Sequence, residues 1–138
     1  MKEKLCAFMG ALGGGLAFLF GPWTSDLSAL MVCMTVDLMS GVAVALLFHN
    51  SKKTPTGSYS SAYGFQGLCK KAMLLSVVAV GHQMDRMLGV GYIRTALCAG
   101  FLSNEVLSIA ENAGLMGIPL PKALKQALDI LQNKEERK

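Results

Sequence analysis

Four apolar segments, separated by short polar stretches, make up most of the chain. They cover residues 5–20, 27–48, 68–88 and 93–113. A helix rises about 1.5 Å per residue, so about 20 apolar residues cross a hydrocarbon core of about 30 Å. The pattern therefore predicts four transmembrane helices. The first is the shortest and either crosses fully or lies shallow in the membrane.

A fifth, amphipathic helix is predicted after the last apolar segment. Gly117, Pro119 and Pro121 separate it from the fourth helix, because glycine and proline mark helix ends. Leucine and alanine then recur at helical spacing over residues 119–133, with charged residues on other faces. We expect this helix to lie on the membrane surface or on a neighbouring subunit, followed by a solvated charged tail, 134–138.

Composition also indicates a membrane protein. The 138 residues are 52% hydrophobic and 16% charged, whereas soluble domains have about 25% charged residues. Too little polar surface remains to cover a soluble globule, so we predict one all-α integral membrane domain over residues 1–138. The net charge of +4 lies in short clusters between apolar runs, which favours contact with anionic lipid and not with nucleic acid.

The placement of lysine and arginine predicts the orientation. Basic residues precede the first segment, lie around the loop between the second and third, and follow the fourth, while only Arg86 and Arg94 border the other side. The positive-inside rule makes the basic side cytoplasmic, with both termini inside. Residues 50–67 are expected to form a flexible cytoplasmic loop. A three-span arrangement, which leaves one basic cluster outside, is the alternative.

Small residues in the first segment suggest a face for helix packing. Gly10 and Gly14 lie four positions apart, which places them on one side of a helix where another helix can approach closely. We expect a helix–helix contact there. Loose packing of an undemanding helix is the alternative.

The fourth segment contains polar residues that a simple membrane anchor would lack. Each acid near the centre of a spanning helix costs about 2.5–3.5 kcal/mol on insertion scales. These polar residues are Asn104, Glu105, Ser108, Glu111 and Asn112. Together with Asp37 of the second segment, such a helix face is typical of a pore wall or of a polar seam between subunits.

Depth along the predicted helices indicates which charges near the membrane boundaries can pair. At the outer boundary, Asp85 can meet Arg94. At the inner boundary, an acid and an amide of the fourth helix can meet either of two lysines at the start of the third. These residues are Glu111 and Asn112 on one helix, and Lys70 and Lys71 on the other.

Two carboxylates remain at mid-depth. They belong to Asp37 and Glu105, and the nearest candidate partners are His82 and Asn104. The acids are either protonated and hydrogen-bonded between helices, or they line a water-filled path. Either arrangement points to oligomerisation, because four short helices have little interior of their own.

No catalytic, cofactor-binding or metal-binding residues are predicted, and we expect a non-enzymatic protein. The cysteines have no Cys or His at metal-ligand spacing and lie in or beside apolar runs, where cysteine behaves as a small hydrophobe. They are Cys6, Cys33, Cys69 and Cys98. His82 has no plausible nucleophile in its helix, so no enzymatic arrangement is recognisable.

A specific motif spans the end of the fourth segment. Asn-Glu-x-x-Ser-Ile-x-Glu-Asn begins at Asn104, and Gly-Ile-Pro-x-Pro begins at Gly117. Further matching positions occur at Asp37, Gly41, Ala45, Ser61, Gly64, Gly67, Lys70, Lys71, Asp85 and Arg94. On these residues the chain resembles the toxin secretion/phage lysis holin family, also called phage holin family 4. The resemblance covers residues 37–131, and Gly41 is expected to lie at a helix-packing position.

The resemblance implies a small multi-pass protein of the bacterial inner membrane, made by a bacteriophage or prophage. Such a holin oligomerises and, at a timed trigger, forms lesions that release an endolysin or a toxin. Its partners would be further copies of itself, the lipid bilayer and this cargo. Two alternatives stay open: a proton- or cation-coupled transporter with Asp37, His82 and Glu105 as its relay, and an antiholin or structural membrane subunit.

Overall fold

The computed structural model describes residues 1–135, which form helices and connecting turns without a strand in that range. The helices are α1 (Lys2–Phe20), α2 (Ser25–Leu46), α3 (Ser61–Leu88), α4 (Ile93–Leu115) and α5 (Lys122–Glu135). The all-α prediction is therefore confirmed. By length and composition, α1 and α2 are able to cross a membrane. The count of four spans and the orientation stay predictions.

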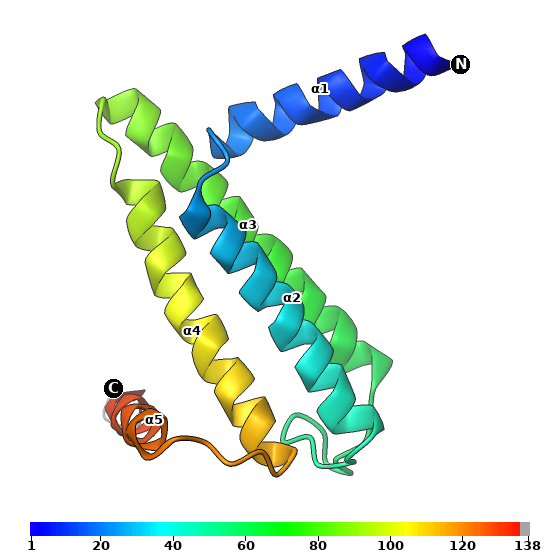
Figure 1. The fold of residues 1–138 in the computed structure, drawn as a ribbon, viewed down its shortest axis with the longest axis vertical. Coiled ribbons are helices and arrows are strands. Elements are labelled where there is room, and N and C mark those ends of the chain that lie inside the picture. Colours follow the sequence, from blue (N-terminus) through cyan, green and yellow to red (C-terminus); the bar gives the residue numbers. More distant parts are fainter. Residues whose placement is uncertain (136–138) are drawn as a thin grey trace.

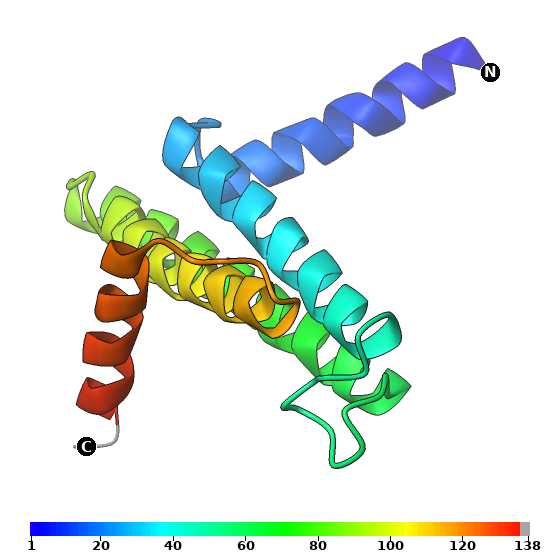
Figure 2. The same cartoon turned by 60° about the horizontal axis from the view of Figure 1, so that its bottom comes forward.

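Helices α2, α3 and α4 form an antiparallel bundle (Figure 1). Helix α4 packs against both of the others, whereas α2 and α3 contact each other little. Helix α1 projects away from one end of this bundle, and α5 lies across the other end (Figure 2). The long α2–α3 connection and the start of α5 are therefore at the same end.

The helix boundaries differ from the predicted ones mainly in α3 and α5. Residues 61–67, which we expected in a flexible loop, form the first turns of α3, so that boundary was wrong. The remaining loop folds back on itself, and the Ser51 N–H donates to the Gly57 carbonyl at 3.0 Å. Helix α5 begins at Lys122, after the second of two prolines, and not at residue 119. The predicted tail covers residues 134–138, and its last three residues lie outside the described part of the chain.

Helix α1 has no buried residue. A Cβ atom added at Gly10 or Gly14 would meet nothing within 4 Å, so the packing expected at these glycines is not made within one chain. Only the end of α1 is attached to the bundle. There the Gln83 side-chain amide donates to the Phe18 carbonyl at 2.8 Å, and the Arg86 guanidinium lies over the Phe18 ring.

The bundle packs along seams in which inward-facing residues recur every three or four positions, as in coiled coils. In α3 these positions are Lys71, Leu74, Val78, Gly81 and Asp85. Half of each seam is apolar, and the core there consists of Leu27, Leu30, Met34, Val78 and Cys98. The other half, toward the α2–α3 loop, contains most of the buried polar residues of α2 and α4.

Helices α3 and α4 approach closely at Gly81, and this contact gives a stability prediction. A Cβ atom there would lie 2.5 Å from Leu97 Cδ1 and 3.5 Å from Arg94 Cα. We expect Gly81→Val to destabilise the protein by about 1–3 kcal/mol through overpacking. The control Gly100→Val introduces the same side chain where nothing lies within 4 Å. Thermal unfolding in detergent, followed by circular dichroism, compares them, and equal melting temperatures would contradict this packing.

Candidate functional site

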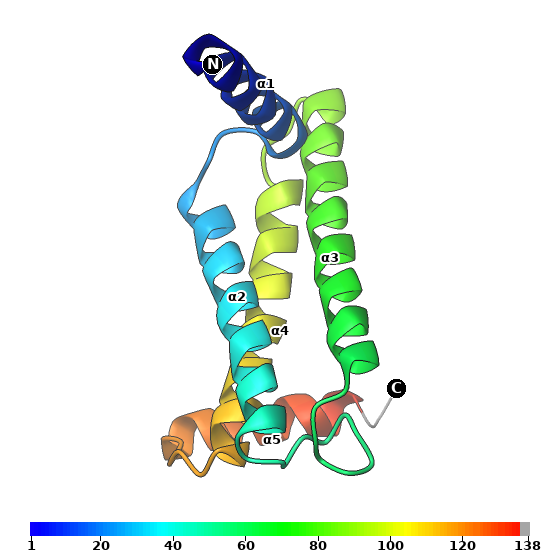
Figure 3. The same ribbon diagram turned by 90° about the vertical axis from the view of Figure 1, so that its right-hand side faces the viewer.

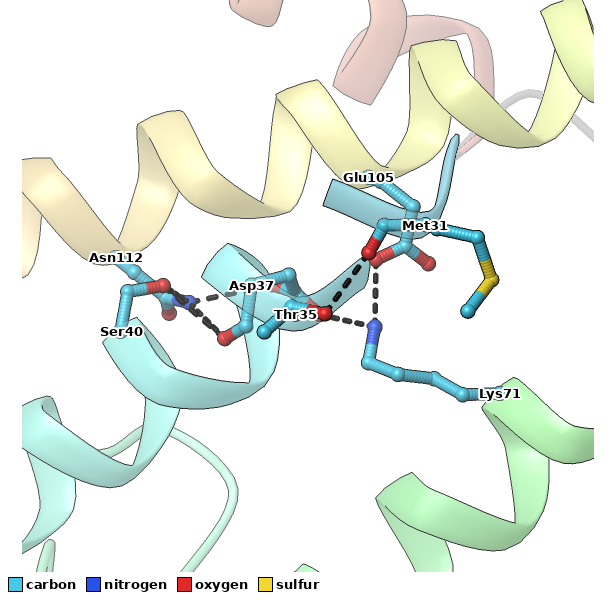
Figure 4. A network of polar contacts seen from close by, with 7 residues as sticks. All are labelled: Met31, Thr35, Asp37, Ser40, Lys71, Glu105 and Asn112. Carbon is cyan, nitrogen blue, oxygen red and sulfur yellow. Dashed lines mark hydrogen bonds and ion pairs between the residues drawn. The ribbon is translucent and has the colours of Figure 1, made fainter. Parts of the chain in front are cut away.

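Three charged side chains, one from each helix of the bundle, meet inside the polar half of the seam. Lys71 Nζ lies 2.6 Å from Asp37 Oδ2 and 2.5 Å from Glu105 Oε2 (Figure 4). The side chains of Lys71, Asp37 and Glu105 are 12%, 10% and 7% exposed, respectively. We call these three residues the charged triad.

The helix boundaries explain why these residues meet at one level. Asp37 lies nine residues before the end of α2 at Leu46, Glu105 lies ten before the end of α4, and Lys71 lies ten after the start of α3. Because the helices alternate in direction, these counts all run from the same end of the bundle. Each residue is therefore about 14–15 Å from that end, at 1.5 Å per residue.

Helical phase then turns the side chains toward one another. Lys71 lies seven residues before Val78, and Glu105 lies seven residues after Cys98, and both of these apolar residues are fully buried in the core. A spacing of seven keeps residues on the same face of packed helices. The neighbouring Lys70 is off this face and is exposed. The triad therefore occupies positions that apolar side chains fill elsewhere in the bundle.

The triad contains one ammonium group and two carboxylates, so its formal charge is −1 when all three groups are ionised. Removing each ion from water costs several kcal/mol, and only close pairing with further hydrogen bonds offsets this cost. Lys71 supplies a charge-assisted bond to both carboxylates. Without it, two like charges would face each other in a poorly solvated seam, so Lys71 is the group on which the pairing depends.

Asn112 extends the polar seam toward the loop. Its Nδ2 donates to Ser40 Oγ at 2.9 Å and to Asp37 Oδ1 at 3.3 Å, while the Ser40 hydroxyl donates to the Asp37 carbonyl at 3.0 Å (Figure 4). The two oxygens of Asp37 thus serve different partners, Lys71 and Asn112. A Cβ atom on Gly41 would lie 3.7 Å from Asn112 Nδ2, an ordinary van der Waals contact. Gly41 therefore lies at the contact between α2 and α4, as expected, but a Cβ atom would fit there.

The structure corrects two expected pairings. We expected Asn112 to meet Lys70 or Lys71, but it bonds to α2, and Lys71 belongs to the triad. The reason is that α3 starts earlier than predicted, which moves Lys71 from the helix end into the helix. We also expected His82 beside the mid-depth acids. Its ring instead lies against Gly21 at the end of α1.

The polar residues of α4 do not all face the same way. Glu105 and Asn112 are buried, Ser108 is half-buried, and Asn104 and Glu111 are exposed. Ser108 and Glu111 line a cleft of about 550 Å³ that also borders the triad. The expected single polar face is therefore divided, with its inner part turned toward α2 and α3.

A second polar cluster closes the opposite end of the bundle. The Asp85 carboxylate accepts hydrogen bonds from the backbone N–H groups of Ile93 and Arg94, both at 2.9 Å, and thereby caps α4. We expected Asp85 and Arg94 to pair through their side chains. They do meet, but the contact is to the backbone of Arg94.

The guanidinium of Arg94 instead holds the α1–α2 turn. It donates to the carbonyls of Phe20 and Pro22 at 2.7 and 3.1 Å and to the Thr24 hydroxyl at 2.8 Å, and it lies 3.9 Å from the Asp26 carboxylate. Helix α1 is thereby fixed to the bundle at its last residue. This role was not predicted, because turn carbonyls leave no signal in a sequence.

The described residues include no group of three or more His, Cys, Asp or Glu side chains placed to hold a metal ion. All the cysteines are free thiols, of which Cys98 is buried in the apolar core and Cys6 and Cys69 are exposed. The chemistry that the site offers is therefore ion pairing and hydrogen bonding between helices.

The triad gives a second stability prediction. Lys71→Met leaves two buried carboxylates without their cation and should destabilise the bundle by about 3–5 kcal/mol. Lys70→Met removes the same charge at an exposed position and should change stability little. The triple variant Asp37→Asn, Lys71→Met, Glu105→Gln should recover most of the loss, since it removes the whole charge cluster. Unfolding in detergent measures the stability of the three variants. Equal stability of the two single variants would contradict the pairing.

Comparison with known proteins places the chain in a family. An uncharacterized protein of Halalkalibacterium halodurans is 36% identical, covering 99% of this chain and 100% of the relative. An uncharacterized 14.9 kDa protein in the nagH 3' region of Clostridium perfringens is 34% identical, covering 91% and 90%. A protein of Bacillus phage phi105 named probable holin is 26% identical, covering 88% and 84%. No solved structure is significantly similar. The pattern of the Bacteriophage holin family matches residues 14–133, so the chain belongs to that family, as its motifs predicted.

Proposed function

We propose that the chain is a holin, which accumulates in the bacterial inner membrane, oligomerises and forms lesions at a timed trigger. The lesions release an endolysin or a toxin. Family membership supports a membrane protein that makes pores and does not act as an enzyme, and the phage relative named probable holin supports the same function.

The observation that carries the proposal is the polar half of the seam. Asp37, Lys71, Glu105 and Asn112 are more polar than three packed helices in a bilayer require. In the closed bundle they satisfy one another. If the helices separate, the same side chains need water, because unpaired charges in hydrocarbon are costly. A water-filled lesion provides that environment. The polar groups would then be satisfied in two states, by one another in the closed bundle and by water in the open one.

The triad would hold the three helices together in the closed state. Lys71 of α3 is the shared partner of α2 and α4, and α2 and α3 otherwise contact each other little. As copies accumulate, contacts between neighbouring chains would compete with this closure until the polar faces of α2 and α4 line water. Depolarisation would favour opening if charge moves across the membrane field.

We further propose that α2, α3 and α4 span the membrane together with α1, with both termini in the cytoplasm. The antiparallel bundle fits this orientation for the lysine-containing loop and the start of α5, which lie at one end (Figure 1). Helix α1 projects from the other end and would have to turn back along the bundle to bring the N-terminus to the same side. Helix α1 is apolar after its first turn and has no buried residue. Its surface, including Gly10 and Gly14, would then face lipid or a second copy of the chain.

Expression in a bacterium tests the function. Above a threshold amount of protein we expect an abrupt loss of membrane potential and of viability, recorded over time. A membrane potential that persists at high expression would contradict the holin assignment.

A variant of the triad tests the closure. Glu105→Gln replaces the ion pair between α3 and α4 with a weaker hydrogen bond from the Lys71 ammonium to an amide oxygen. We therefore expect an earlier trigger at equal protein level. Asp129→Asn, which changes an exposed acid of α5, should leave the trigger time unchanged. Equal trigger times for the two variants would show that the Glu105 carboxylate does not control opening.

A further inference from the structure

The cleft beside the triad has features of a binding site. Its lining residues come from α2, α3 and α4 and from residues 51–54 of the loop. Figure 3 shows how these helices are arranged, with α4 behind α2 and α3. The cleft has a volume of about 550 Å³, within the range of about 300–1,000 Å³ typical of ligand pockets. It is present because α2 and α3 contact each other little, so their facing side chains leave this space unfilled.

The two parts of the cleft differ in chemistry. Along the helices its walls are aliphatic, formed by Leu38 and Val42 of α2 and by Met73, Leu74 and Val77 of α3. Toward the loop the lining becomes polar and basic. Such a cleft is suited to a molecule with an elongated apolar part and a charged group at one end.

The basic end carries three lysines in addition to Lys71. Lys52 and Lys53 come from the loop and Lys70 from α3, and all three side chains are exposed. Lys71 is engaged by two carboxylates of the triad, so it is not the cation that a ligand would meet. Glu111 is the further acid in the lining. Counting the triad, the whole lining has four lysines and three acids, a net charge of +1. The three lysines outside the triad concentrate the positive charge at this end, which makes it complementary to an anion.

We propose that the cleft binds an anionic phospholipid of the cytoplasmic leaflet. The headgroup phosphate lies among Lys52, Lys53 and Lys70, and an acyl chain lies along the aliphatic walls. Basic pockets between helices on the cytoplasmic side are suited to anionic headgroups. The proposal rests on the membrane placement proposed above. A bound lipid would join α2 to α3 beside the triad.

Native mass spectrometry of the full chain in a nonionic detergent tests the site. We expect phosphatidylglycerol to remain bound where phosphatidylcholine with the same acyl chains does not. Lys53→Gln with Lys70→Gln should weaken phosphatidylglycerol binding by about tenfold to thirtyfold, from about 1 kcal/mol per lysine. Lys122→Gln with Lys125→Gln removes the same charge from exposed positions of α5 and should leave binding unchanged. Equal losses in the two double variants would overturn the site in favour of general surface attraction.

A second pair of variants tests whether the lipid occupies the cleft itself. Gly67 lines the cleft, and a Cβ atom there would meet nothing within 4 Å, so Gly67→Leu can fill the space without a clash. Gly100→Leu adds the same side chain at an equally open position of α4 outside the cleft. We expect only Gly67→Leu to reduce lipid binding. Equal binding by both variants would overturn occupation of the cleft by the lipid.

Two competing occupants give other results. Displacement of phosphatidylglycerol by millimolar inorganic phosphate would identify a phosphate site and overturn the lipid proposal. A lipid-free dimer that Gly67→Leu dissociates would identify a second copy of the chain as the occupant. The lysis experiment is independent of these: a chain that depolarises cells without preferring phosphatidylglycerol overturns only the lipid site, and one that binds the lipid without depolarising cells overturns only the proposed function.

Discussion

One lysine serves two carboxylates that come from different helices in an apolar bundle, and the arrangement of the bundle depends on this pairing. Lys71 contacts Asp37 and Glu105 within 2.6 Å, so α3 must hold a fixed depth and rotation relative to α2 and α4. A shift of α3 by one residue would turn Lys71 about 100° away from the seam, as 3.6 residues form a turn. Apolar contacts tolerate such shifts more easily, because Leu and Val side chains need no particular partner.

The seam therefore has two halves with different roles. The apolar half, with Leu30, Val78 and Cys98 fully buried, holds the helices together, and Arg94 fixes the turn that leads to α1. The polar half fixes which residues of the helices face one another. Because α2 and α3 contact each other little around the cleft, we expect the helices to separate most easily in this half. In the open state proposed above, the same few side chains would be solvated by water.

Hydrophobic pattern alone predicted most of the fold. Residues 93–113 were expected as one helix and form most of α4. Pattern failed for residues 61–67, because the first turns of α3 are polar and contain two glycines, and a helix there is stabilised by its continuation. That error misplaced Lys71. The seven-residue spacing from Lys71 through Val78 to Asp85 was visible in the sequence and would have placed the lysine in the seam. The contacts of Ser40 and Arg94, in contrast, depend on backbone carbonyls and turn geometry that no sequence pattern specifies.

Lys71 pairs with both mid-depth carboxylates in the closed bundle, and the account of the bundle rests on this pairing. Solid-state NMR tests it directly in lipid bilayers, with ¹⁵N in the lysine side chain and ¹³C in the aspartate and glutamate carboxylates. The Lys71→Arg variant identifies the lysine signal. Rotational-echo dephasing should show the Lys71 nitrogen in direct contact with both the Asp37 and the Glu105 carboxylate carbons, and each contact should vanish in Asp37→Asn or Glu105→Gln, respectively. A Lys71 nitrogen that shows no dephasing from either carboxylate would contradict the account.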